Sequence, residues 1–201
     1  MPSVTDAIKN RRSTRKYSPK PIPKKILTEI LEAARWAPSA HNAQPWRFII
    51  LTDVSAKRAL AKAMMKAWIK DLTADKVNVE NREEMTKASI QRFAHAPVLV
   101  LACLTMTDMK KYADETRQQI ERDLAIQSLG AAIQNMLLSA HSEGLGACWL
   151  CAPAFCKDAV TKALAIPEDL EPQALITLGH SAEKPTVPKR KLFEDIFTWD
   201  Y

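Results

Sequence analysis

Two short segments near the start of the chain hold side chains suited to binding a polar ligand. The first contains Arg11, Arg12 and Arg15, with the hydroxyl group of Ser13 between them. Guanidinium groups match phosphate oxygens bidentately, and a serine hydroxyl adds another donor. Clusters of this kind also occur on solvated surfaces, where charged side chains are mostly found. The segment therefore predicts either a phosphate site or an exposed charged turn.

The second segment, residues 37–46, is rich in side chains that form hydrogen bonds. Ser39, His41, Asn42 and Gln44 lie there, between an expected helix and an expected strand. Carboxamides carry both donors and an acceptor, which suits the edge of a heterocycle such as a flavin or a nucleobase. The alternative is a loop that is held together by its own side-chain hydrogen bonds.

Two later segments could approach the same ligand. Gly144 and Gly146, in the run Glu-Gly-Leu-Gly-Ala-Cys-Trp, would let the backbone approach a flat group closely. A helix end followed by a strand explains the same pattern. The basic run 188–191 fits a phosphate partner and a solvated surface equally well.

The net charge of +6 comes from the two ends of the chain. Residues 1–25 carry eight Lys/Arg and one acid, and residues 184–191 carry four Lys/Arg and no acid. Residues 26–183 are nearly neutral, with 17 basic and 19 acidic residues. The two basic ends could bind one phosphorylated ligand if the fold brings them together.

The hydrophobic periodicity predicts helices separated by short strands. Ser3 and Pro23 are expected to begin the first two helices, and Pro38 to end the second. Residues 73–91 are polar and predict no clear element, so they could form a mobile excursion over a site. The expected strands are 46–52, 98–106, 147–151 and 174–178, and the further helices are 55–72, 112–143 and 155–164. This pattern predicts one α+β domain, 1–201, with three αβα layers and a small central mixed sheet.

The order of these segments resembles that of the FMN-dependent nitroreductase family. The matching pieces are RRSTRKY at 11–17, APSAHNAQPWRFI at 37–49, EGLGACWL at 143–150, and ITLGHSAEKPTVPKRKLFEDIFTWD at 176–200. The resemblance therefore extends over nearly the whole chain. It implies a homodimer with FMN at the subunit interface and an exchanged C-terminal arm, 186–201.

The resemblance also implies roles for individual residues. The phosphate and ribityl chain would bind Arg11, Arg12, Ser13 and Arg15 of one subunit, with Arg190 and Lys189 as further contacts. The flavin ring would lie along Trp149 and Leu150 of that subunit. The other subunit would contribute the ring contacts Pro38, Ser39, Ala40, Asn42 and Gln44, while His41 would touch the substrate.

The implied activity is hydride transfer from NAD(P)H to a nitroaromatic, quinone or similar electron-poor acceptor, by a ping-pong mechanism at the flavin N5 atom. No side chain is expected to be catalytic, because the cofactor carries the chemistry. Many relatives have a Glu-Gly pair where this chain has Cys151-Ala152, so the resemblance does not specify the acceptor. The alternatives are a specialised dehalogenase, a flavin-modifying or ring-oxidising enzyme, or a non-redox FMN-binding protein.

Other functional classes fit the sequence less well. It contains neither a GxGxxG nor a Walker motif, so no dedicated dinucleotide domain is expected. Cys148 and Cys151 lack the second CxxC pair of a common zinc site, and no metal is expected. No helix has a continuous basic stripe for nucleic acid, and no apolar run is long enough to span a membrane. A cytoplasmic location is the expectation.

Overall fold

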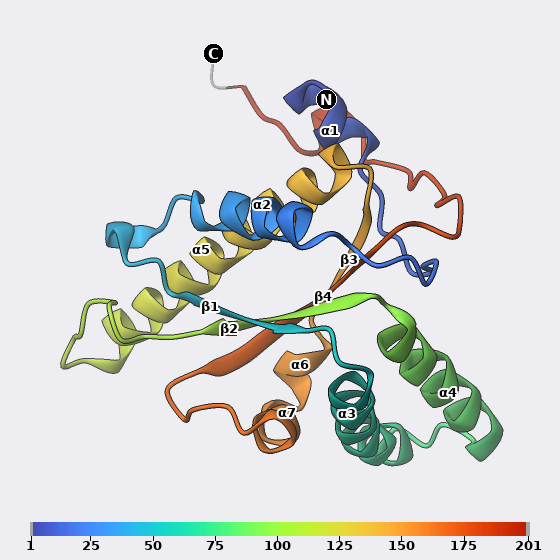
Figure 1. The fold of residues 1–201 in the computed structure, drawn as a ribbon. Helices are drawn as coiled ribbons and strands as arrows, with labels where there is room; N and C mark the ends of the chain where they lie inside the picture. Colours follow the sequence, from blue (N-terminus) through green and yellow to red (C-terminus); the bar gives the residue numbers. More distant parts are fainter. Residues whose placement is uncertain (1, 200–201) are drawn as a thin grey trace.

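The computed structural model describes residues 2–199, which form three layers (Figure 1). A four-stranded sheet is the middle layer, with the strand order β1-β2-β4-β3. Helices cover both faces of this sheet. The expected α+β, three-layer αβα architecture is confirmed.

The central strand β2 (Val98–Leu104) is buried along its whole length. Its neighbours are β1 (Trp46–Leu51) and β4 (Glu171–Gly179), and β4 also pairs with β3 (Gly146–Leu150). Because helices cover both faces, β2 is apolar at every position rather than at alternate ones. The strand pairings differ from the expected mixed sheet, since all of these neighbours pair antiparallel.

One face of the sheet packs against α2 (Lys24–Arg35) and the long helix α5 (Glu115–Ser142). The Asp114 carboxylate accepts from the Arg117 N–H and so begins α5. Gly144 follows the other end with φ 72°, the left-handed conformation that glycine adopts most readily. The short helix α1 (Val4–Asn10), capped by Ser3, contacts α5.

The opposite face packs against α3 (Val54–Ala74), α4 (Val79–His95), α6 (Ala152–Phe155) and α7 (Lys157–Leu164). Two short 3₁₀ turns, η1 (Ala40–Asn42) and η2 (Phe193–Asp195), complete the fold. Among the described residues, no helix is both long and apolar enough to cross a membrane.

The prediction that residues 73–91 form no clear element was wrong, because most of them belong to α4. The Asn78 carboxamide accepts from the Asn81 N–H and begins the helix. Phe93 and Thr86 are buried, whereas most of the other side chains face solvent. The helix is stabilised mainly by its packing on α3, which a local polar composition does not reveal.

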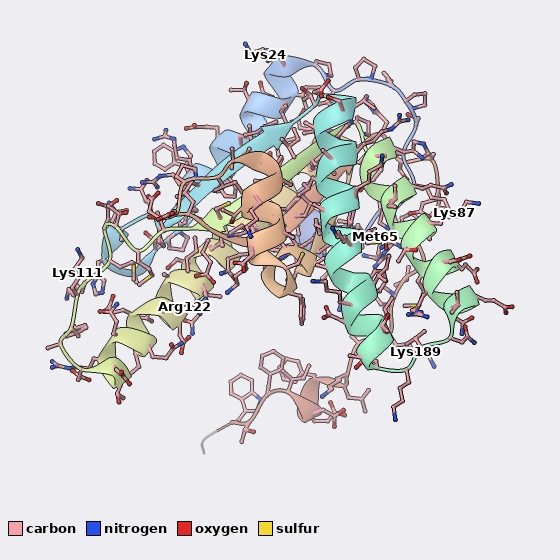
Figure 2. The ribbon with its side chains drawn as sticks, turned by 90° about the horizontal axis from the view of Figure 1, so that it is seen from below. Lys24, Met65, Lys87, Lys111, Arg122 and Lys189 are labelled. Atoms are coloured by element: carbon pink, nitrogen blue, oxygen red, sulfur yellow. The ribbon has the colours of Figure 1, made fainter. Side chains whose placement is uncertain are left out.

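The C-terminal segment leaves the body of the protomer (Figure 2). Its large apolar side chains are more than half exposed, including Leu192, Phe193 and Phe197. The rings of Phe193 and Phe197 stack on each other, 4.3 Å between centroids. Exposed apolar side chains at this density are typical of a surface that another chain covers. Residues 200 and 201 of the expected arm lie outside the described residues.

Candidate functional site

The two basic ends of the chain meet in one pocket of about 420 Å³, which we call the arginine pocket. It is lined by Arg11, Arg12, Ser13, Arg15, Glu183, Lys184, Pro185, Thr186, Pro188 and Arg190. Five of these residues are cations and one is an acid. The structure therefore brings together five of the residues predicted to bind phosphate.

Contacts with β3 fix the N-terminal side of the pocket. Ser13 forms a parallel bridge with Ala147, and the Thr14 N–H donates to the Ala147 carbonyl at 2.9 Å. Thr14 packs so closely on Gly146 that a Cβ atom at position 146 would lie 2.6 Å from the threonine Oγ1. Gly146 is thus required by this close approach of two backbones.

Tyr17 holds the same segment against the end of β4. Its hydroxyl lies 2.5 Å from the Thr14 carbonyl and 2.6 Å from the Thr177 hydroxyl. Tyr17 also forms a bridge with Ser181, so residues 13–18 are held between β3 and the chain that follows β4. Burial raises the pKa of Tyr17 above its ordinary value, which keeps the hydroxyl protonated.

The pocket concentrates positive charge that its own carboxylate offsets only in part. Burial lowers the pKa of Arg11, and the nearby charges of Arg190 and Arg12 lower it further. The Nε atoms of Arg11 and Arg12 are buried without a hydrogen-bond partner in the described part of the chain. The Glu183 carboxylate instead accepts from the Arg15 N–H at 2.5 Å. An anion with several oxygens, such as a phosphate, fits these donors.

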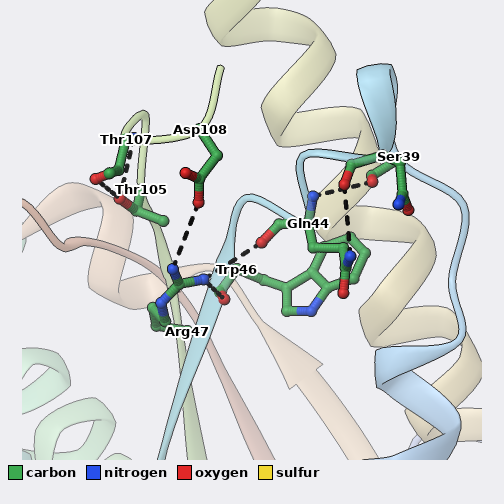
Figure 3. Close-up of polar contacts among 8 residues, drawn as sticks. Ser39, Gln44, Trp46, Arg47, Thr105, Thr107 and Asp108 are labelled. Atoms are coloured by element: carbon green, nitrogen blue, oxygen red, sulfur yellow. Dashed lines mark hydrogen bonds and ion pairs between the residues drawn. The ribbon is translucent and has the colours of Figure 1, made fainter.

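The second candidate segment, the 38–44 loop, is held partly by its own hydrogen bonds (Figure 3). The Ser39 hydroxyl accepts from the Gln44 N–H at 3.0 Å, and the Gln44 carboxamide lies 3.4 Å from the Asn42 carbonyl. Ala40 donates its N–H to the Ser128 hydroxyl of α5 at 3.1 Å. The loop thus combines both interpretations of its sequence, because internal bonds fix the backbone while several side chains stay exposed.

Three residues of this loop have the left-handed backbone conformation. The φ angles are 56° at His41, 53° at Asn42 and 48° at Gln44. This conformation is uncommon for residues other than glycine, although asparagine and histidine adopt it more often than most. Local backbone strain of this kind clusters at ligand-binding sites, where the surrounding packing enforces it.

Glu121 of α5 lies beneath the loop and was missed by sequence reasoning. It is 4% exposed, and its Oε1 atom lies 3.2 Å from Nε2 of His41. A signal was available, because Glu121 shares a helical face with the buried residues Ala125 and Ser128. A charged residue on a buried face is rare unless it is paired.

Trp149 and Leu150 lie at the end of β3, beyond the residues that contact the arginine pocket. Trp149 is 38% exposed, and its Cη2 atom lies 3.6 Å from the position of a Cβ atom at Gly130. The indole ring thus lies against the middle of α5 at an ordinary van der Waals distance. Leu150 lines a second pocket of about 520 Å³, together with Trp68 and Arg92.

The arginine pocket and the 38–44 loop lie near different parts of α5. Leu137 and His141 lie beside the end of α1 and Arg11, whereas Ser128 and Glu121 contact the loop. At 1.5 Å per residue, these two groups of α5 residues are about 14 to 30 Å apart along the helix axis. Figure 1 likewise shows α1 and the loop that contains η1 at opposite ends of this layer.

The pocket also contains Lys184, which belongs to the basic segment 184–191, and Glu183, which no sequence motif indicated. Lys189 is exposed and is not among the residues that line the pocket, although its neighbours Pro188 and Arg190 are.

Residues 8–180 match the model of the nitroreductase family. The chain belongs to the nitroreductase family. This confirms the resemblance found in the sequence and makes the protein an oxidoreductase by family.

Individual nitroreductase relatives cover almost the whole chain. A Methanothermobacter thermautotrophicus protein assigned as an NADH dehydrogenase/NAD(P)H nitroreductase is 30% identical and covers 95% of this chain and 83% of its own length. YfhC of Bacillus subtilis, assigned as an NAD(P)H nitroreductase, is 28% identical, with 97% and 93% covered. Both relatives thus extend over the arginine pocket and the 38–44 loop.

Solved structures of the family support the same conclusion. A BluB-like flavoprotein from Clostridium difficile superimposes with a TM-score of 0.82 at 25% identity, and all of both chains is covered. A nitroreductase-type protein from Desulfovibrio desulfuricans, whose crystal structure contains FMN, has a TM-score of 0.75 at 28% identity and covers 100% of this chain and 99% of its own.

Proposed function

We propose that this protein holds FMN noncovalently and uses it to reduce nitroaromatic, quinone or similar electron-poor acceptors with NAD(P)H, by a ping-pong mechanism. The observation that carries the proposal is the convergence of both chain ends on the arginine pocket, beside the strand β3. The FMN in the Desulfovibrio desulfuricans relative and the NAD(P)H in the names of other relatives support this choice of cofactor and donor.

In the proposed complex the arginine pocket binds the phosphate group. Arg11 and Arg12 each offer a buried Nε–H that has no partner among the described residues. Their charge-assisted hydrogen bonds would be stronger than those of neutral donors. The residues proposed for the phosphate and ribityl chain are Arg11, Arg12, Ser13, Arg15, Arg190 and, by a longer reach of its side chain, Lys189.

The flavin ring would extend from this pocket along the end of β3, next to Trp149 and Leu150. The 38–44 loop of a partner subunit would hold the ring edge through Pro38, Ser39, Ala40, Asn42 and Gln44. Two subunits are needed in this proposal because the loop and Arg11 of one protomer lie beside parts of α5 that are about 14 to 30 Å apart along the helix axis. The exposed C-terminal arm offers the apolar surface for such a homodimer.

FMN, when bound, supplies the hydride-carrying chemistry between the donor and the acceptor. The protein contributes position and charge. The cations of the arginine pocket fix the phosphate, and β3 aligns the ring. The strained 38–44 backbone presents its polar groups at the ring edge before any ligand arrives, which reduces the cost of ordering them.

The proposal is tested with purified protein under anaerobic conditions. We expect a yellow protein whose absorption near about 450 nm, a property of the flavin itself, bleaches with NADH or NADPH and returns with a quinone or a nitroaromatic. A yellow protein that neither donor bleaches would indicate a non-redox FMN-binding protein. Bleaching without reoxidation by this acceptor panel would favour the specialised family members.

A further inference from the structure

We propose that His41 and Glu121 form a proton-delivering pair for the acceptor, with His41 as the donor and Glu121 as the residue that positions it. This inference rests on the proposed function, which places the 38–44 loop at the flavin ring. It assigns a role to a buried carboxylate that the binding of FMN does not explain.

The carboxylate of Glu121 is held in an unusual environment. Its side chain is 5% exposed, Oε1 lies 3.2 Å from His41 Nε2, and Oε2 is buried without a hydrogen-bond partner among the described residues. In residues 2–199, no lysine or arginine nitrogen lies within 4.0 Å of this carboxylate. The next residue, Arg122, pairs with Glu171 instead, at 2.6 Å.

Burial of a carboxylate is costly unless a partner compensates it, so a structural explanation of Glu121 alone is incomplete. An apolar residue on this face of α5 would pack next to Ala125 without that cost. His41 is the one charged or titratable partner that the structure provides for Glu121 in the described residues. The buried pair therefore costs more stability than an apolar contact at this place would, and such departures from local packing rules are typical of functional sites.

The geometry also leaves His41 able to reach a ligand. Its side chain is 32% exposed, and only Nε2 is used by Glu121. In the protonated imidazole the other nitrogen, Nδ1, is a second donor. The positive φ angle of 56° sets the direction of the side chain, and the bond from Ala40 to Ser128 fixes the loop on α5.

The proton balance of acceptor reduction requires such a group. A quinone that becomes a hydroquinone gains two electrons and two protons. The hydride from the reduced cofactor supplies both electrons and one proton. In our proposal the His41 imidazolium gives the second proton to the substrate oxygen, becomes neutral, and is protonated again from water through its exposed side. Glu121 accepts from Nε2 and so positions the ring.

The test separates proton transfer from electron transfer by the choice of acceptor. Ferricyanide takes up one electron and no proton, whereas a quinone takes up protons. We expect His41→Asn to slow quinone reduction by about 100-fold or more, the range for loss of a general acid, and to change ferricyanide reduction less than about threefold. Asparagine is chosen because it tolerates the left-handed backbone.

Glu121→Gln removes the charge beneath His41 while retaining the size of the side chain. We expect it to slow quinone reduction about tenfold to 100-fold and to spare ferricyanide reduction. The solvent deuterium isotope effect of the quinone step should rise, because the slowed proton transfer limits the rate more strongly. Ser128→Ala is the matched control, because Ser128 contacts the same loop from the same helix without a titratable group. Ser128→Ala should slow the reduction of both acceptors equally and only a few-fold.

Two further measurements complete the design, and the first of them requires no turnover. In the flavin-free protein, the nitrogen-15 NMR signal of His41 Nε2 should report an altered hydrogen bond in Glu121→Gln and remain unchanged in Ser128→Ala. Added imidazole should restore quinone reduction in His41→Gly, in which glycine accepts the φ angle of 56°.

Equal slowing of both acceptors in His41→Asn, or an unchanged His41 ring in Glu121→Gln, would overturn the pair. If Glu121→Gln does not fold, His41→Asn and the imidazole rescue still test whether His41 donates the proton. Failure of the proposed function gives a different result, because the wild-type protein would then not be bleached by NADH or NADPH.

Discussion

The arginine pocket and the 38–44 loop are built in opposite ways. The pocket joins residues 11–15 to residues 183–190, and hydrogen bonds to β3 and to the end of β4 hold it. The loop is one continuous segment whose backbone is strained at three positions. The described residues that line the pocket come from both ends of one protomer, and none of them belongs to the 38–44 loop. This difference supports a ligand that is shared between two subunits.

The largest effect is expected when two variant proteins, one altered in the pocket and one in the loop, are mixed. In the proposed homodimer, Arg11→Ala removes a contact with the phosphate and Asn42→Ala removes a contact with the flavin ring. Each variant alone should therefore have little activity. In an equal mixture that exchanges subunits, mixed dimers contain one intact site, which restores about a quarter of the wild-type sites. Turnover with NADH and a quinone measures the recovery.

A mixture without any recovery would show that one protomer supplies both contacts to the same ligand. Native mass spectrometry of the mixture serves as the control, because a mixed dimer has a mass between those of the two homodimers and so reports whether the subunits exchange.

Ligands with and without phosphate should distinguish the role of the arginine pocket from that of the 38–44 loop. Arg11→Ala should weaken FMN binding about tenfold to 150-fold, which corresponds to ~1.5–3 kcal/mol for one charge-assisted hydrogen bond. Riboflavin, which lacks the phosphate, should bind both proteins equally. Titration followed by flavin fluorescence measures both affinities.

Two controls refine this result. Lys9→Ala removes the same charge from α1 outside the pocket lining and should leave both ligands unaffected. Arg12→Ala is less clean, because Arg12 also donates to the carbonyls of Lys9 and Arg11 at 2.6 and 2.8 Å. Equal losses for FMN and riboflavin in Arg11→Ala would contradict a phosphate role.

A pair of glycine substitutions tests whether the pocket depends on β3. Gly146→Ala places a Cβ atom 2.6 Å from Thr14 and should lower the free energy of unfolding by about 1–3 kcal/mol, as overpacking does. FMN affinity should fall with it. Gly130→Ala places a Cβ atom 3.6 Å from Trp149, which is an ordinary van der Waals distance. This variant should be neutral or stabilised by up to about 1 kcal/mol, since alanine favours helices.

Chemical denaturation measures both variants, and flavin titration reports on the site. Unchanged FMN affinity in a destabilised Gly146→Ala protein would show that the contact with β3 does not position the pocket.

The smallest effect is expected inside the loop. Ser39→Ala removes the acceptor of the Gln44 N–H and should cost about 0.5–1.5 kcal/mol, the net value of one hydrogen bond. FMN and riboflavin should lose the same few-fold affinity, because the loop is proposed to contact the ring and not the phosphate. A loss confined to FMN would place Ser39 with the pocket instead.

Local signals in the sequence were sufficient for much of the fold. Ser3 and Pro23 begin their helices as expected, and the apolar run from Val98 forms the buried central strand. Such features depend on neighbours within one turn or along one strand, so their cause is contained in a short segment. The helix α4 escaped prediction because its stability comes from α3 rather than from its own composition.

The sequence by itself determined the residue types of the site: the guanidinium groups of residues 11–15, the carboxamides of the 38–44 loop, and the family to which their order belongs. Only the tertiary structure decided which of them meet. Glu183 bonds the backbone of Arg15 over 168 positions, and Glu121 pairs with His41 over 80 positions. Contacts at such separations depend on how the sheet and α5 pack, which no local pattern encodes.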